Sequence, residues 1–226
     1  MKKAIFTFIL LMIAMSMLSA GVVGLFTAAK GKVSLTRNDR NVKFKNGDML
    51  YDADEIRTGK QSFAAYKYID GSSTIKVFAN SYVKVSGVRN GKAVNKTTQV
   101  NSGSVYTKVT PGRGGSMTVE TPTSVASVKG TGFLTKVNAI KEATYIVTEG
   151  VVELKVMNKD EVTEVKAGQT AIVDKDLNLM VRDTTEEDLD EIEQAEIESA
   201  QNYVPKKVTI QVADEQGRIK YIEITY

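Results

Sequence analysis

From Lys30 to about Asp183 the sequence alternates short β-branched segments with turn residues, and it has no long stretch of helical period. Glycine, asparagine or aspartate interrupts the apolar alternation about every 8 to 14 residues. Short strands at this spacing are typical of an all-β sandwich, barrel or solenoid. The pair Asp70-Gly71 predicts a hairpin or tight corner between two such strands. Further turns are predicted at Asn46-Gly47, Asn90-Gly91 and Pro111-Gly112.

A weak internal repeat bears on the choice among these architectures. Gly-x-Val opens three segments, "GKVSLTR" at residue 31, "GSVYTKV" at residue 103 and "GVVELKV" at residue 150. Stacked coils repeat one turn at every rung, so the recurrence favours a β-solenoid. The intervals of 72 and 47 residues are irregular, which leaves coincidence as the alternative.

The first 29 residues predict export. Lys2 and Lys3 precede an uncharged, mainly apolar run from Ala4 to Ala29. This pattern is typical of a secretory signal peptide, with small residues for cleavage at Ala20 or Ala29. The run is also long enough to remain as an N-terminal anchor in the inner membrane. Both alternatives place the rest of the chain in the periplasm or at the cell surface, with membrane contact only through residues 4–29 if they are retained.

The composition excludes several kinds of chemistry. Cysteine, histidine and tryptophan are absent. The lack of cysteine and histidine rules out disulfides, thiol and imidazole catalysis, and nearly every structural zinc site. Two Ser-x-x-Lys matches, Ser73 with Lys76 and Ser81 with Lys84, lie in strand-like sequence. Three residues along a strand put the two side chains on opposite faces. We therefore predict no catalytic residue, no cofactor and no metal site.

Two polar segments are interpreted as structural. Asp52, Asp54 and Glu55 form an acidic group that is more typical of a turn with Asx-type hydrogen bonds than of a glycosidase pair. Residues 111–116, "PGRGGS", lack the Gly-Lys-Ser/Thr ending and the following helix of a phosphate loop, which favours a mobile loop.

The two parts of the chain carry opposite charge. Residues 30–183 hold 24 Lys and Arg against 16 Asp and Glu, a net charge of +8. Residues 184–226 hold 4 against 11, a net charge of −7. The basic residues are scattered, which favours a solvated surface, and export argues against a nucleic-acid partner.

After Asp183 the pattern changes to helix and then hairpin. Thr184 and Glu187 fit a capping box, and residues 184–203 predict a surface helix with a thin apolar stripe. Its eight acids in residues 186–198 predict a solvated face rather than a cation site. Residues 204–226 predict a C-terminal β-hairpin with "ADEQGR" as its turn. A hairpin this small must pair with or pack on something else.

The stretch from 31 to about 173 resembles a FecR-type domain. The resemblance rests on "NGDMLYDADEIRTGK", on "DGS" at residue 70, and on "VTEGVVELK" and "VKAGQTAIV" in the same order. The family's hallmark is Thr-Pro followed by Ala-x-Val-[Arg/Lys]-Gly-Thr-x-Phe. The matching residues here are Thr121, Pro122, Ala126, Val128, Lys129, Gly130, Thr131 and Phe133.

The resemblance implies an extracytoplasmic all-β module over residues 30–183, a right-handed β-solenoid-like domain, with residues 1–29, 184–203 and 204–226 as separate regions. The named family members relay iron-siderophore signals to a cytoplasmic sigma factor through a cytoplasmic domain that precedes their membrane span. Only Met1-Lys2-Lys3 precede the apolar run here, so we expect a stand-alone exported domain without that sigma-regulating part.

Two functions are expected from this reading. The first is a non-enzymatic binding or scaffold module that engages an envelope protein or cell-wall polymer, for example by strand addition. The alternative is a membrane-associated component of a cell-surface signalling relay of the iron type that works with a separate cytoplasmic regulator.

Gly130-Thr131-Gly132 in the hallmark is predicted to be a corner. Ala126 and Val128 occupy even positions and Phe133 an odd one, so the strand must bend or bulge to keep its core face. No helix start follows that could cradle a phosphate. The motif residues are therefore interpreted as structural.

Overall fold

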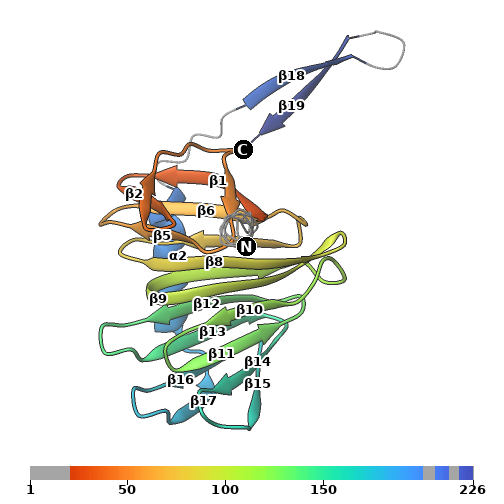
Figure 1. Cartoon of the computed structure of the whole chain (residues 1–226). Helices are drawn as coiled ribbons and strands as arrows, with labels where there is room; N and C mark the ends of the chain where they lie inside the picture. The colour runs from red at the N-terminus through yellow and green to blue at the C-terminus, as the bar shows by residue number, and fades with distance from the viewer. Residues whose placement is uncertain (1–20, 201–206, 214–218, 226) are drawn as a thin grey trace, which may run out of the picture.

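The computed structural model describes residues 21–200, 207–213 and 219–225, and β-strands dominate it. Strands make up 59% of the chain, and one helix lies near the C-terminus, so the predicted all-β class is confirmed. The long strand β9 (Ala93–Val109) links the other main strands into one extended, largely antiparallel sheet that folds into two layers. We name these layers sheet A and sheet B, and β9 contributes to both (Figure 1).

Sheet A forms one layer along the whole stack, and every pair of neighbours in it is antiparallel. Its strands in spatial order are β4 (Met49–Tyr51), β1 (Val22–Lys30), β6 (Phe63–Tyr68), β7 (Ser73–Val77), the second half of β9, β12 (Gly132–Val137), β13 (Ala143–Glu149), β16 (Gln169–Val173) and β17 (Leu179–Asp183).

Sheet B forms the facing layer and contains the parallel pair β9–β10. Its strands in spatial order are β3 (Arg40–Val42), β2 (Val33–Arg37), β5 (Asp54–Thr58), β8 (Tyr82–Asn90), the first half of β9, β10 (Met117–Glu120), β11 (Ser124–Val128), β14 (Val151–Val156) and β15 (Val162–Lys166).

The hydrophobic core lies between the two sheets. Alternate residues of each strand point inward, as the period-2 pattern predicts, and the largest fully buried side chains include Tyr66, Tyr145 and Phe133. Tyrosine hydroxyls connect the layers across this core. Tyr66 Oη lies 2.8 Å from Thr98 Oγ1, and Tyr145 Oη lies 3.0 Å from Ser124 Oγ. These bonds give the buried hydroxyls the partners that burial demands.

The register does not show the predicted right-handed β-solenoid. Stacked coils would pair equivalent strands in parallel, whereas β9–β10 is the parallel pair among the described strands. The chain instead forms antiparallel hairpins that alternate between the sheets, such as β12–β13 in sheet A and β14–β15 in sheet B. Asp70-Gly71 does turn the chain, with Gly71 at φ +71°, but it makes the hairpin β6–β7 rather than a coil corner.

The Gly-x-Val repeat marks three of the places where the chain changes sheet. Gly31 connects β1 in sheet A to β2 in sheet B, and Gly150 connects β13 to β14 in the same direction. Gly103 lies inside β9, where the strand passes from sheet B into sheet A. All three have positive φ, at +71°, +75° and +85°, a region that glycine enters without steric cost. The repeat is therefore a real structural repeat, although it is not that of a solenoid.

Part of the predicted N-terminal segment belongs to the folded body. Residues 1–20 lie outside the described residues, whereas residues 22–29 of the predicted segment 1–29 lie in β1. Val23 and Phe26 are 2% and 0% exposed, and β1 pairs with both β4 and β6. The predicted boundary at residue 29 therefore falls inside a core strand, and residue 21 is the boundary that keeps the strand whole.

The predicted acidic helix and terminal hairpin are both present. Helix α2 (Glu186–Ala200) begins at a reciprocal cap in which Thr185 N donates to Asp188 Oδ2 and Asp188 N donates to Thr185 Oγ1. The cap is thus one residue later than the predicted Thr184 and Glu187 pair. Strands β18 (Lys207–Ala213) and β19 (Ile219–Thr225) form a two-stranded antiparallel sheet. In the described part of the chain, no helix has the length and apolar character needed to cross a membrane.

Removing residues 1–20 should leave the fold intact, whereas removing residues 1–29 should damage it. The longer deletion removes β1, and loss of the buried Phe26 side chain alone costs about 3–5 kcal/mol. Urea unfolding followed by circular dichroism checks this, with the full chain as reference. Equal unfolding midpoints for the two truncated chains would contradict the placement of β1 in the core.

Candidate functional site

The motif residues predicted from the sequence lie together on β11, β12 and the corner between them. Ala126, Val128 and Phe133 are buried and belong to the main core, in which Ala126 lies in sheet B and Phe133 in sheet A. Pro122 and Lys129 are exposed. These three motif residues therefore help to pack the two layers together.

Gly130 forms the corner between the sheets and contacts a second corner. It has φ +77°, and a Cβ at this position would lie 2.6 Å from Pro111 Cγ. A Cβ on Gly150 would lie 2.6 Å from the carbonyl oxygen of Gly130. The two corners thus pack backbone to backbone, which only glycine permits. Gly132 begins β12, close to Tyr106 Oη.

Gly130→Val should destabilise the protein by roughly 2–4 kcal/mol, because a β-branched residue at positive φ adds strain and its Cβ meets Pro111. Gly168→Val is the matched control, since Gly168 has φ +82° with open space around its Cβ position. Chemical denaturation measures both variants. A Gly130→Val protein no less stable than Gly168→Val would show that the corner contact is unimportant.

Thr121 begins the motif and helps to hold Tyr145 in the core. Its Oγ1 lies 3.0 Å from the Ser124 carbonyl and 3.2 Å from Tyr145 Oη. Burial raises the pKa of Tyr145 to about 12, partly offset by hydrogen bonds from Ser124 and Thr121. Thr131 Oγ1 is buried with no hydrogen-bond partner among the described residues. The neutral phenol and the threonines form a packed polar cluster rather than an acid–base pair.

The acidic group at residues 52–55 is structural, as predicted. Asp54 is fully buried and receives both Arg37 Nε and Arg37 Nη2 at 2.7 Å. Tyr51 N donates to Asp54 Oδ2 at 2.9 Å, and the Arg37 guanidinium lies over the Tyr51 ring. Asp52 accepts a hydrogen bond from Gly87 N. These carboxylates fix the β4–β5 turn, and a buried carboxylate held by arginine is no nucleophile for a sugar.

The two Ser-x-x-Lys matches do not form a catalytic pair. Ser73 is 1% exposed and bonds to Ser72, whereas Lys76 lies on the outer face of sheet A and pairs with Glu196. Ser81 bonds to the carbonyl groups of Ala79 and Ser104. The opposite-face prediction for Ser73 and Lys76 is correct.

Sequence reasoning missed a buried ion pair between Asp70 and Lys96. Lys96 is 1% exposed, and its Nζ donates to Asp70 Oδ2 at 2.8 Å and to the carbonyls of Val94 and Gly115 at 2.9 and 3.1 Å. Ser72 donates to Asp70 through its backbone N and its hydroxyl. The pair ties the β6–β7 turn to β9 and to the loop before β10. Alternation gave no signal, because a lysine in a strand is expected outside.

The hydrogen bonds of this pair also set the charge of Asp70. Burial by itself would raise the pKa of Asp70, but the hydrogen bonds from Lys96 and Ser72 outweigh it and lower the pKa below the usual carboxyl value. A carboxyl with a lowered pKa stabilises the fold fully above its unfolded-state pKa. That contribution is lost as the pH falls through the folded-state pKa.

Lys96→Met should cost about 3–5 kcal/mol, because it leaves a buried carboxylate without its cation. The double variant Asp70→Asn/Lys96→Met should recover part of this loss.

The stability advantage of the wild type over Asp70→Asn should be full above about pH 5 and shrink below about pH 4. Urea unfolding between pH 3 and 7 measures it, and an advantage independent of pH would contradict an ionised Asp70.

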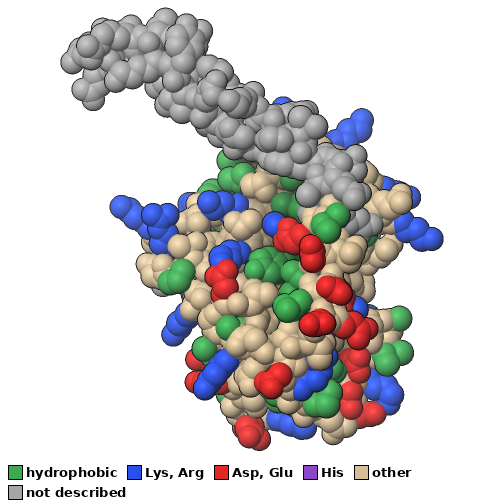
Figure 2. Space-filling view, turned by 180° about the vertical axis from the view of Figure 1, so that it is seen from behind, with side chains coloured by type: hydrophobic (Ala, Val, Ile, Leu, Met, Phe, Trp, Pro, Cys, Tyr) green, Lys and Arg blue, Asp and Glu red, His purple; other side chains and the backbone are tan. Residues whose placement is uncertain are grey.

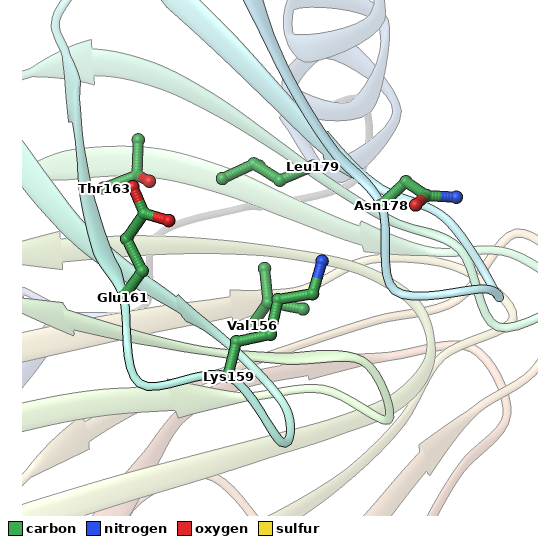
Figure 3. Close-up of a pocket in the computed structure, with 6 residues that line it drawn as sticks. All are labelled: Val156, Lys159, Glu161, Thr163, Asn178 and Leu179. Carbon is green, nitrogen blue, oxygen red and sulfur yellow. The ribbon is translucent and has the colours of Figure 1, made fainter.

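A cleft opens at the end of the stack formed by β15 and β17, which we call the C-terminal end of the stack. It has a volume of about 360 Å³ and is lined by Val156, Lys159, Glu161, Thr163, Asn178 and Leu179 (Figure 3). Val156 closes β14 and belongs to the core, so the cleft reaches the end of the apolar interior. Lys159 Nζ donates to the Leu177 carbonyl at 2.6 Å and thereby connects the turns of the two sheets.

The last strand of each sheet borders this cleft. In the described part of the chain, β17 pairs with β16 alone and β15 with β14 alone. Thr184 N donates to Gly168 O, and Asp174 N donates to Asn178 O. Because ladder bonds alternate in an antiparallel pair, residues 179, 181 and 183 direct their backbone groups away from β16. This end of the stack therefore presents free strand edges beside a cleft whose lining includes the core residue Val156.

The cleft at the opposite end of the stack is smaller. A cleft of about 270 Å³ lies there, with Phe44, Met49 and Tyr51 among its lining residues. Its edge strands β3 and β4 have three residues each, and the Arg37–Asp54 pair lies beside them. Short edge strands are a common protection against pairing with another chain. The C-terminal end is therefore the better candidate binding site.

The acids of α2 are not simply solvated, which corrects the sequence prediction. Asp188 pairs with Arg182 on β17, Glu191 with Lys136 on β12, and Glu196 with Lys76 on β7. These pairs join acids of the negatively charged C-terminal part to basic residues of sheet A. Part of the opposite charge of the two regions is therefore paired between them. Within the described residues, no group of three or more Asp or Glu side chains could hold a metal ion.

Comparison with known proteins finds a family model that matches part of this chain. Residues 54–153 match the family model described as "FecR protein". Two crystal structures titled as a putative anti-sigma factor from Parabacteroides distasonis ATCC 8503, at 2.50 and 1.65 Å resolution, match with TM-scores of 0.51 and 0.50. Their sequences are 15% and 16% identical to this one, so the likeness shows the fold.

The matches to the solved structures are partial. They cover 60% and 62% of this chain and 62% and 64% of the solved chains, so the chain spans less than two thirds of the length of the structures it matches. A search of curated proteins finds no match.

Proposed function

The chain carries a FecR domain, and on that premise we propose that it is a non-enzymatic extracytoplasmic module that binds an envelope protein. The binding site is the C-terminal end of the two-sheet stack, and the partner contributes a strand to the edge of β17. The single observation that supports this best is the five-residue edge of β17 beside a cleft that reaches the core.

Strand addition fits the chemistry of this end. An added strand gains its affinity from main-chain hydrogen bonds, which residues 179, 181 and 183 can supply. Its side chains would alternate between the cleft and the outer face, where Met180 is 53% exposed. On the facing sheet, Val162 at the start of β15 is also 53% exposed. An apolar residue of the partner that points into the cleft would instead meet Val156 and Leu179, which line it.

The rim of the cleft favours a protein over a cell-wall polymer. The cleft is lined by a cation and an anion, Lys159 and Glu161, beside the apolar side chains of Val156 and Leu179. Protein interfaces combine such a polar rim with an apolar centre. A polysaccharide would instead gain most from aromatic platforms, and the chain has no tryptophan.

Val181→Pro should abolish capture of the partner, because it removes an outward backbone N–H from the edge of β17. Val181→Ala is the matched control, since it removes apolar bulk but keeps the N–H. Crosslinking in the native cell envelope followed by affinity capture measures the recovered partner. Equal recovery with the two variants would contradict strand addition, and recovery of glycan alone would favour the polymer.

A second candidate is a membrane-associated part of a signalling relay that works with a separate cytoplasmic regulator. The fold shared with putative anti-sigma factors favours it. Cleavage of the N-terminal segment distinguishes the two functions. A mature protein that begins near residue 21 would keep β1 but lose its route to a cytoplasmic regulator, which favours the binding module.

A further inference from the structure

The outer face of sheet A carries an apolar stripe beneath helix α2. We define the sheet A stripe as the buried residues Ala28, Phe63, Ala65, Phe78, Leu134 and Ile146. These residues face away from the main core and form a second cluster, against which Ile192 and Ala195 of α2 pack. Figure 2 shows this side of the molecule, where acidic side chains gather in a band beside apolar ones. The outer face of a sandwich is usually polar, so the stripe calls for a partner.

Basic side chains flank the stripe at three heights of the stack. Asp188 pairs with Arg182 at 2.5 Å, Glu191 with Lys136 at 2.6 Å, and Glu196 with Lys76 at 2.5 Å. The three cations come from β17, β12 and β7, so α2 runs across the strands from the C-terminal end of sheet A toward its N-terminal half.

The contacts of α2 all lie on one helical face. Counted from Asp188, the contacting residues fall at i, i+3, i+4, i+7 and i+8, which is the spacing of a single amphipathic stripe. Ile192 and Ala195 form its apolar centre, and the acids lie on its margins. The sheet A stripe therefore recognises a helix by two features, an apolar pair and flanking carboxylates.

The helix is held weakly for an element that covers an apolar surface. Among the described side chains of α2, Ile192 and Ala195 are the apolar ones that pack on the stripe. Leu189 and Ile197 remain 51% and 39% exposed. The three ion pairs are partly exposed to water, where each contributes little and is screened by salt. A helix of 15 residues has little stability without tertiary contacts.

We propose that the sheet A stripe is a docking surface for an acidic amphipathic helix of a partner protein, and that α2 occupies this surface in cis as a displaceable cover. A partner helix with a larger apolar pair and the same margin of carboxylates would compete with α2 for Lys136, Lys76 and Arg182. The cover keeps the stripe from water when the partner is absent. This inference uses a different face from the end cleft and stands independently of strand addition there.

The first test measures binding of the helix in trans. A fluorescent peptide with the sequence of residues 184–200 is titrated into full-length protein. Ile192→Asp should release the cis helix, so the peptide should bind this variant at least tenfold more tightly than wild type. Leu189→Asp is the matched control, because Leu189 is exposed on the same helix, and it should behave as wild type. Hydrogen exchange of the α2 amides should rise only in Ile192→Asp.

A charge exchange identifies the docking surface. Lys136→Glu added to Ile192→Asp should weaken peptide binding about threefold to fivefold at low salt, because repulsion replaces the ion pair, and a Glu191→Lys peptide should recover binding to that double variant. Circular dichroism of each variant confirms that the sheets remain folded.

Three outcomes would overturn the proposal. The first is equal peptide binding by wild type and Ile192→Asp. The second is no recovery by the Glu191→Lys peptide. The third is equal binding of a scrambled peptide of the same composition, which would show that the face recognises negative charge rather than a helix.

Discussion

The fold depends on how the chain crosses between two sheets that share one core. Facing sheets lie about 10 Å apart, so each crossing needs a short and sharp change of direction. Gly31, Gly103, Gly130 and Gly150 provide it at four of the crossings, each at positive φ, and Ala53, Gln61 and Asn80 reach positive φ at three others. The Gly130 and Gly150 corners also touch, with room for no Cβ between them. Because β9 passes through such a crossing in mid-strand, it joins the two sheets into one continuous structure, and the layers cannot separate without breaking it.

Most of the strands could be predicted from the sequence, but the way they pair could not. Apolar alternation reports which residues face a core, and it placed Ala126, Val128 and Phe133 correctly. It does not report whether the next strand returns antiparallel or continues into a coil, because Asp70-Gly71 turns the chain in either case. The solenoid expectation came from the Gly-x-Val repeat and the family resemblance, and neither of them fixes the direction in which neighbouring strands pair. The N-terminal boundary had a similar origin, since hydropathy cannot separate an apolar signal segment from the apolar core strand β1 that follows it.

The polar features show the same limit over longer distances. Asp70 and Lys96 lie 26 residues apart and meet only because β6, β7, β8 and β9 bring their turns together. The charge difference between the body and the tail was visible in the composition. Its structural role was not visible, because composition cannot reveal that three acids of α2 pair with cations on three separate strands of sheet A. The edge of β17 was equally hidden, since a strand edge is a property of the register and not of the residues.

The two proposed surfaces share one strand, and this gives them a physical connection. Arg182 lies on β17, where its backbone belongs to the ladder with β16 and its guanidinium holds the first turn of α2 through Asp188. Thr170 of β16 also bonds to Asp188, so the helix start is fixed to the last two strands of sheet A. A strand added at the free edge of β17 would order this strand and strengthen the hold on α2. A partner that displaced α2 would remove the anion that Arg182 now binds and loosen the same edge. We therefore expect negative coupling between the two surfaces: a partner bound at one surface lowers the affinity for a partner at the other, because the two events favour opposite states of α2.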